Sequence, residues 1–348
     1  MHHFKKLFSA GAALAAASIF LAACGSSSTA ASSTSSGSPT TSSASSSTLH
    51  TIKVGLTSKT ATDWPLYVAD KLGYFKQEGV NVQYVIVGSA AGNAQQLTAG
   101  SINIGETSST QVVEAIQGGA PIKYVVNQVI TPPYTLVGQK NIKTIQDLKG
   151  KTVIIGGSND ITRVFLDAML KPNGLSESDL SFTYAGATSN RYAALKSGSV
   201  AAAILFPPFD FTALSQGYSN LGSVQKYLPS FPFDGFAANS AWASSHKTVL
   251  VDFIKAYLKG VSWLYNSANE SQAVSILQSE TNSKAQAAKE TYQELFQQLS
   301  AFSKTGQISS SSMDSVLQAM QKLGLLKSPL PSASKFFDNS YAAAASQG

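Results

Sequence analysis

Cysteine and histidine are scarce in this chain, with one cysteine and four histidines in 348 residues. A single cysteine cannot form a disulfide within the chain, so no such bond stabilises the fold. Beyond Cys24 only His50 and His246 remain, and His246 alone lies deep in the chain. A zinc site or a serine–histidine nucleophile would depend on that one residue. We therefore expect no metal site, and a surface or capping role for His246.

Charge is also scarce, at 13% of residues, and the formal net charge is +6. From Lys53 onward the basic residues are scattered singly, whereas a nucleic-acid surface needs a clustered basic face. Gly150-Lys151-Thr152 is similar to the end of a phosphate-binding loop, but Ile145 stands where the first glycine belongs and the tripeptide precedes its strand. We expect no nucleic-acid partner, no nucleotide and no other cofactor.

The segment 1–23 is typical of an export leader, with basic Lys5 and Lys6 before an apolar stretch that small residues interrupt. The stretch ends in Leu21-Ala22-Ala23-Cys24, which resembles the lipobox of bacterial lipoproteins. The segment 25–48 is almost wholly Ser, Thr, Ala and Gly, a composition that cannot bury a core. The sequence predicts a leader at 1–23, a lipid on Cys24 that anchors the exported protein outside the cell, and a tether at 24–50. An ordinary leader that ends in a chance cysteine is the alternative.

The body from about residue 51 is longer than one hydrophobic core usually grows, which favours two lobes. Strand-like segments alternate with helical periodicity, a pattern typical of βαβ units. The pattern restarts after Pro132-Pro133, and the chain returns to the first lobe near Phe233-Asp234-Gly235-Phe236. We predict an α/β fold with mostly parallel sheets, with lobe 1 at 51–132 and 235–335 and lobe 2 at 133–234.

The last third of the chain has helical spacing at 248–265, 270–279, 284–299 and 313–323. These segments predict a helical part that belongs to lobe 1. The tail after Pro331 is expected to be loose, apart from Phe336-Phe337.

Four strand-to-helix junctions carry small hydroxyl or amide residues, at 88–89, 105–109, 156–159 and 186–190. The first amides of a helix lack partners within the helix, so a polar group bound there gains roughly 1 kcal/mol per contact. In a parallel sheet these junctions lie at the carboxyl ends of the strands, where ligands bind in open α/β folds. Two junctions from each lobe are expected to face each other across a cleft, with simple helix capping as the alternative for each one.

Several segments have a distinctive order and spacing, including Trp64-Pro65-Leu66-Tyr67, Leu72-Gly73-Tyr74-Phe75, and residues 97–105, 147–153 and 198–208. Together they resemble the nitrate, sulfonate, taurine and thiamine-pyrimidine-precursor group of ABC-transporter solute-binding proteins. The resemblance implies a two-lobe periplasmic-binding-protein fold of type II. It also implies a binding protein, not an enzyme, that delivers a small-molecule ligand to an ABC permease in the membrane. Nothing in the sequence suggests more than a monomer.

Carried onto this sequence, the resemblance implies ligand-binding residues directly after the strands of both lobes. They are Trp64, Pro65, Gly88, Ser89, Thr107 and Ser108 in the first lobe, and Ser158, Asn159, Asp160, Asn190, Phe206 and Pro207 in the second. Trp64 offers a ring on which a ligand can stack, and a core position in the first helix is the alternative.

Carboxylates outnumber guanidinium groups near the expected cleft, with Asp63, Glu106, Asp160 and Asp210 against Arg163 and Arg191. Nitrate or a sulfonate prefers donors and a guanidinium. The charges therefore favour a neutral or cationic aromatic or heterocyclic solute, such as a pyrimidine precursor, over a sulfonate or nitrate. Two alternatives stay open: an extracellular hydrolase-like enzyme with Glu106 and Asp160 as acid and base, and a surface scaffold lipoprotein without a ligand.

Overall fold

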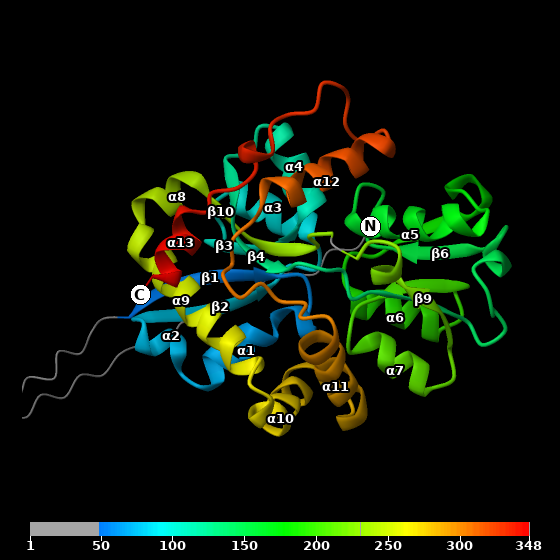
Figure 1. Ribbon diagram of the computed structural model, residues 1–348, viewed down its shortest axis with the longest axis horizontal. Coiled ribbons are helices and arrows are strands. Elements are labelled where there is room, and N and C mark those ends of the chain that lie inside the picture. Colours follow the sequence, from blue (N-terminus) through cyan, green and yellow to red (C-terminus); the bar gives the residue numbers. More distant parts are fainter. Residues whose placement is uncertain (1–48, 230, 348) are drawn as a thin grey trace, which may run out of the picture. The chain divides into compact units, whose positions relative to one another are not determined.

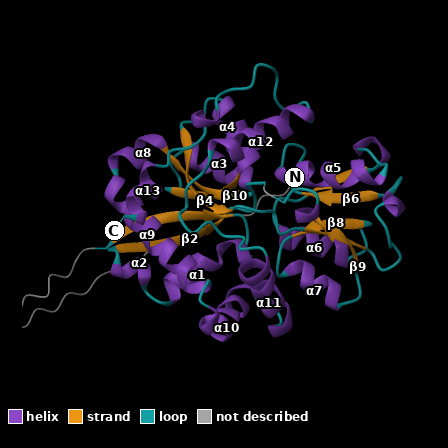
Figure 2. Ribbon diagram, in the orientation of Figure 1, coloured by secondary structure: helices purple, strands orange, loops and turns teal. Residues whose placement is uncertain are grey.

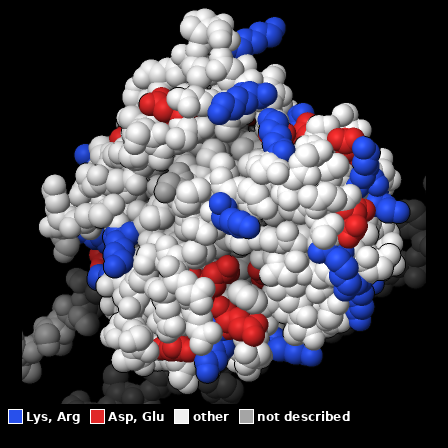
Figure 3. Space-filling view, turned by 45° about the vertical axis from the view of Figure 1, so that its right-hand side comes forward, with Lys and Arg blue, Asp and Glu red and all other residues white. Residues whose placement is uncertain are grey.

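The computed structural model in Figure 1 describes residues 49–229 and 231–347. The predicted leader, Cys24 and nearly all of the tether lie outside the described residues. Two separate sheets, drawn orange in Figure 2, form the centres of two lobes with helices around them. Among the described residues, no helix is both long and apolar enough to cross a membrane. On the face drawn in Figure 3, Lys and Arg side chains are dispersed over a mainly neutral surface.

The sheet of lobe 1 has the strand order β2-β1-β3-β10-β4. β1 pairs in parallel with β2 and β3, whereas β10 pairs antiparallel with β3 and β4. Four strands therefore run the same way and β10 is reversed. The bounds are His50–Leu56 for β1, Val80–Ile86 for β2, Ile104–Ser108 for β3, Ile122–Val129 for β4 and Asp234–Asn239 for β10.

The sheet of lobe 2 repeats this plan in the order β7-β6-β8-β5-β9, again with one reversed strand, β5. The bounds are Thr135–Gly138 for β5, Thr152–Ile155 for β6, Ser181–Tyr184 for β7, Ala202–Leu205 for β8 and Ser219–Ser223 for β9. In each lobe the reversed strand is the first one formed after the chain crosses from the other lobe. The two sheets are therefore mixed, and no sequence pattern pointed to β5 or β9.

Helices cover both faces of the sheet in lobe 2, which is why its strands are apolar on both sides. Val153 and Ile155 pack into the large core that contains Phe165, while Ile154 between them packs into a second cluster with Leu195. Alternate residues of a strand point to opposite faces, so one short strand supplies both cores. The helices of this lobe are α5, Ile161–Leu170; α6, Thr188–Lys196; and α7, Phe209–Ser215.

The C-terminal helices pack mainly on lobe 1, where α9 contacts α1, α2 and α13. One of these helices, α11, also contacts α7 of lobe 2. The bounds are α1, Trp64–Lys71; α2, Tyr74–Gln77; α3, Ala90–Thr98; α4, Ser109–Gln117; α8, Ser240–Ser245; α9, Lys247–Leu264; α10, Glu270–Thr281; α11, Ala285–Tyr292; α12, Ser310–Lys322; and α13, Ser340–Ser346. A π-helix over Gln293–Gln298 follows α11 directly.

Two expectations about the ends of the body are wrong. The tail beyond Phe336-Phe337 is not loose, because α13 packs on α9 and β4. Phe336 itself is fully buried and Phe337 bridges to Tyr124. Tyr341 and Ala342 of α13 are buried. The sequence pattern did not predict a helix at this position. At the other end, β1 begins at His50, which the sequence assigned to the tether.

Candidate functional site

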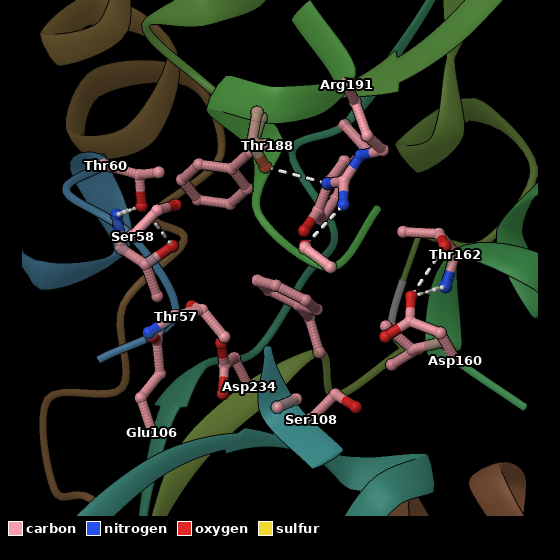
Figure 4. Close-up of a pocket in the computed structure, with 17 residues that line it drawn as sticks. Thr57, Ser58, Thr60, Glu106, Ser108, Asp160, Thr162, Thr188, Arg191 and Asp234 are labelled. Atoms are coloured by element: carbon pink, nitrogen blue, oxygen red, sulfur yellow. Dashed lines mark hydrogen bonds between the residues drawn. The ribbon is translucent and has the colours of Figure 1, made fainter. Parts of the chain in front are cut away.

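A cavity of about 30 Å³ lies between the two lobes (Figure 4). Lobe 1 lines it with Thr57, Ser58, Thr60, Thr62, Ala90, Glu106, Ser108 and Asp234; lobe 2 with Asp160, Ile161, Thr162, Gly186, Thr188, Arg191 and Phe206; and the crossovers with Tyr134 and Phe233. Such a volume has room for very few water molecules, whereas pockets for organic ligands usually start at about 300 Å³. The lobes are therefore closed on each other. A larger hollow of about 480 Å³ along α3 and α4 is an open groove lined mainly by alanines.

The wall from lobe 1 is acidic because of how β3 and β10 pair. Glu106 and Ser108 are two positions apart on β3 and share one face, and Asp234 on β10 lies directly opposite Ser108. Asp234 and Glu106 are therefore diagonal neighbours on this face, close enough for long side chains to touch. The Glu106 carboxylate also accepts the Thr57 amide at 2.6 Å and the Thr57 hydroxyl.

Burial raises the pKa of Glu106 and of Asp234, and repulsion between the two carboxyl groups raises the pKa of Asp234 further. Asp63, behind them, has its pKa raised by burial and then by Glu106. One of its oxygens accepts the Tyr67 hydroxyl at 3.3 Å and the other has no partner among the described residues. None of the ion pairs in the described part of the chain involves these three carboxyl groups. The pair Glu106–Asp234 therefore retains protons more readily than free carboxyl groups do.

The wall from lobe 2 is organised by Arg191, which is only 2% exposed. Its Nε donates to the Ile204 carbonyl at 2.8 Å, and its Nη1 donates to the carbonyls of Ala185 at 2.9 Å and Gly186 at 2.6 Å. Its Nη2 donates to the Thr188 hydroxyl at 2.7 Å. This guanidinium joins the ends of β7 and β8 to the start of α6, so most of its donors serve the protein itself.

Asp160 also faces the cavity from lobe 2, as Figure 4 shows, and its carboxylate caps α5. One oxygen accepts the Thr162 amide at 2.9 Å and the Thr162 hydroxyl at 2.6 Å. Glu106 and Asp160 come from opposite lobes. Asp160 is thus occupied in helix capping, which the sequence offered as the alternative for this junction.

Three aromatic residues line the cavity where the chain crosses between the lobes. The ring centroid of Tyr134 lies 5.1 Å from that of Phe206 and 5.0 Å from that of Phe233, and the two phenylalanines are 5.6 Å apart. Tyr134 precedes β5 and Phe233 precedes β10, so both crossovers are packed against the end of β8. Burial raises the pKa of Tyr134, which keeps its hydroxyl neutral.

Direct contacts between the lobes close the rim of the cavity. Gln111 on α4 donates to the Asn159 carbonyl at 2.8 Å, and the Asn159 amide donates to Glu114 at 2.8 Å. At another point Gly186 lies against Gly88, so tightly that a β-carbon on Gly186 would come within 2.7 Å of the Gly88 carbonyl oxygen. The glycine at this position allows the two lobes to approach.

The structure brings some of the predicted ligand-binding residues to the cavity and not others. Ser108, Asp160 and Phe206 line it. Asn159, Gly88 and Pro207 lie at contacts between the lobes, the last accepting the Ala61 amide at 3.2 Å. The remaining predicted residues are outside the lining: Ser89 caps α3, Thr107 donates to the Ala90 carbonyl at 3.3 Å, the Ser158 carbonyl accepts Arg163, and Asn190 is exposed on α6.

Trp64 and Pro65 lie away from the cavity. Trp64 is fully buried, packs edge-on against Tyr292 and Phe296 at 5.9 and 5.5 Å between centroids, and donates to the Ala273 carbonyl at 3.1 Å. Pro65 packs against Gly260 of α9. The ring of Trp64 therefore belongs to the core and does not offer a stacking surface, because helices from the last third of the chain cover it.

Sequence patterns did not single out several residues that do line the cavity, above all Thr57, Asp234 and Phe233. Asp234 and Phe233 lie in the segment where the chain was expected to return to lobe 1. That expected crossover was the one feature of the sequence that could have placed them near the cavity. Arg163, considered beside Arg191, instead pairs with Glu177 at 2.7 Å. Within 49–229 and 231–347, no group of three or more His, Cys, Asp or Glu side chains is arranged to hold a metal ion.

Two lobes of identical strand order, joined by two crossovers and enclosing a polar cavity, define a periplasmic-binding-protein fold. Residues 62–271, more than half of the chain, match the family model described as NMT1/THI5 like, and the protein belongs to this family.

Solved structures with the same fold include the alkanesulfonate-binding protein SsuA of Xanthomonas axonopodis pv. citri, bound to MOPS, with a TM-score of 0.68 and 17% identity over 82% of this chain and 98% of that one. The periplasmic nitrate-binding protein NrtA of Synechocystis PCC 6803 has a TM-score of 0.72 and 14% identity over 86% of this chain and 89% of that one.

The riboflavin-binding protein RibY of Chloroflexus aurantiacus is 26% identical over 203 residues. The match covers 57% of this chain and 57% of RibY, so the chain spans little more than half the length of that relative.

Proposed function

We propose that this protein is an extracytoplasmic solute-binding protein that captures a small organic solute for an ABC importer. The observation that carries the proposal is the convergence of polar side chains from both lobes on one enclosed cavity. Membership of the NMT1/THI5-like family and similarity to proteins named for binding alkanesulfonate, nitrate and riboflavin support it.

Capture would proceed by hinge motion at the crossovers near Tyr134 and Phe233. The present cavity of about 30 Å³ is too small for an organic solute, so the lobes must separate to admit one. Ser108 of lobe 1 and Asp160 and Phe206 of lobe 2 contact the solute together only when the lobes approach again. The solute thereby shifts the population toward a closed form that a permease can recognise.

We also propose that the chain is exported by its leader, anchored by a lipid on Cys24 and active as a monomer without a cofactor. The hydrolase alternative is not favoured, because one Asp160 oxygen already accepts both the amide and the hydroxyl of Thr162. Asp160 therefore serves to begin α5, and it lies across the cavity from Glu106, on the other lobe.

Mass spectrometry of the purified protein, denatured after native desalting, tests the capture function. We expect one small molecule to be released per chain, and we expect the emptied protein to gain thermal stability when that molecule is returned. Absence of any released molecule, together with no stabilisation by extracts of the growth medium, would favour the scaffold alternative. Conversion of the returned molecule to a product would favour an enzyme.

A further inference from the structure

The two walls of the cavity differ in the charge that they offer to a solute. On the lobe 1 side, Glu106 and Asp234 are 1% and 5% exposed, and both line the cavity. Asp234 accepts the amide of its neighbour Gly235 at 2.7 Å on Oδ1, and Glu106 accepts the amide and the hydroxyl of Thr57, both on Oε2. Among the described residues, these donors reach one oxygen of each carboxyl group, so the pair has acceptor capacity left for donors from a ligand.

Among the described residues, no cation neutralises this wall. The ion pairs of that part of the chain leave out Glu106, Asp234 and Asp63. The cationic side chain that lines the cavity is Arg191, and it donates to three carbonyl groups and the Thr188 hydroxyl. An oxyanion would therefore meet two carboxyl groups and a guanidinium whose donors are mostly occupied.

Aromatic rings complete the lining. Tyr134, Phe206 and Phe233 stand together at the crossovers and all three border the cavity. Aromatic faces attract cations and pack well against flat apolar groups. Carboxyl groups on one side and aromatic rings on another suit a flat solute with positively charged nitrogen.

We propose that the cleft selects a small planar organic cation of the amidine or amino-heterocycle kind and rejects oxyanions such as nitrate and sulfonates. This inference rests on the proposed solute-binding function and names its substrate class. The N–H groups of the cation donate to Glu106 and Asp234, and its ring lies against the aromatic residues of the crossovers. Charge complementarity of this kind distinguishes solutes of the same size and shape.

A matched set of benzene derivatives tests the charge preference, because the ring is constant and only the head group changes. Benzamidine is a cation, benzamide is its neutral counterpart, and benzenesulfonate is an anion. Titration calorimetry at pH 7 on the emptied full-length protein should give benzamidine at least a tenfold lower Kd than benzamide. Benzenesulfonate and nitrate should give no measurable heat of binding.

Two outcomes would overturn the inference. Binding of benzenesulfonate as tight as that of benzamidine would show that the cleft accepts anions, and the capture function would stand. Failure of all four probes would remove the cation class, and the molecule released in the denaturation experiment would still decide whether the protein captures any solute.

Two variants test whether Glu106 and Asp234 are responsible for the preference for a cation. Glu106→Gln and Asp234→Asn should each weaken benzamidine binding at least tenfold. The matched control is Asp210→Asn, which removes a buried carboxyl group that accepts the Thr135 hydroxyl and does not line the cavity. Its Kd should not change. Circular dichroism and the thermal midpoint verify folding, and should Glu106→Gln fail to fold, Asp234→Asn alone decides. Unchanged affinity in a folded Asp234→Asn would contradict the inference.

Discussion

The two lobes share one strand order, yet they build opposite walls of the cavity by different means. Lobe 1 presents two neighbouring carboxyl groups, of which Glu106 accepts hydrogen bonds from Thr57, whereas lobe 2 presents one buried guanidinium that joins its strand ends. Duplicated topology therefore does not imply duplicated chemistry. The side chains placed at the strand ends decide what each half can bind.

The largest loss of stability on the lobe 1 side is expected when the buried ring of Trp64 is removed. Replacement of Trp64 by Ala should lower the free energy of unfolding by about 3–5 kcal/mol, because a large fully buried ring leaves a cavity behind. Urea unfolding measures the loss. The control is Trp242→Ala, which removes a partly buried ring stacked on His246 at 5.2 Å and should cost much less. A Trp64→Ala protein of unchanged stability but weaker solute affinity would return Trp64 to the binding site.

The corresponding change on the lobe 2 side is Arg191→Leu. It leaves the carbonyls of Ala185, Gly186 and Ile204 without their donor, and we expect a loss of about 3 kcal/mol in the free energy of unfolding. Arg163→Leu is the matched control, since it breaks an ion pair with Glu177 nearer the surface and should cost less than about 1 kcal/mol. Equal losses in the two variants would mean that Arg191 does not organise its wall.

The approach of the two walls can be blocked at Gly186. A β-carbon there would lie 2.6 Å from the β-carbon of Ser89, so Gly186→Val should hold the lobes apart. We expect at least a tenfold loss of solute affinity, about 1.4 kcal/mol, and a larger radius of gyration by small-angle scattering. Gly157→Ala serves as control, because its β-carbon meets Asp160 at an ordinary 3.5 Å. Full affinity in Gly186→Val would show that closure does not need this contact.

The last prediction concerns the contact between lobe 2 and the C-terminal helices. Burial, with repulsion from Asp210, raises the pKa of Glu294 to about 8, and burial raises the pKa of Asp210 to about 7. Unfolded carboxyl groups titrate near pH 4. The folded state therefore holds protons that the unfolded state releases, and the free energy of unfolding should fall as the pH rises from about 4 to about 8.

Thermal midpoints at pH 5.5 and 8.5 measure this dependence. Glu294→Gln should flatten the profile, because it removes the carboxyl group whose pKa burial raises most clearly in this contact. A midpoint that rises between pH 5.5 and 8.5 in the unaltered protein would contradict the assignment.

The sequence predicted the starts of helices, because a helix start depends on a capping residue and its nearest neighbours. Ser89 begins α3 by accepting the Gly92 amide at 3.0 Å, and Asp160 begins α5 in the same manner. Ser108, Asp160 and Phe206 were expected at the cavity because each follows a strand that could be recognised by its apolar residues. Asp234 could not be found this way, since it reaches the cavity through pairing with a strand that ends at Ser108, far earlier in the chain.

The sequence by itself determined the α/β class, the alternation of strands and helices, and the places where helices begin, because these depend on residues within a few positions of one another. The tertiary structure alone decided that Glu106 and Asp234 share one wall without a cation from the described residues, that Arg191 serves carbonyl groups and that Trp64 is enclosed by the C-terminal helices. Burial and cross-strand neighbours set the charge of a cavity, and both depend on chain segments that meet only after folding.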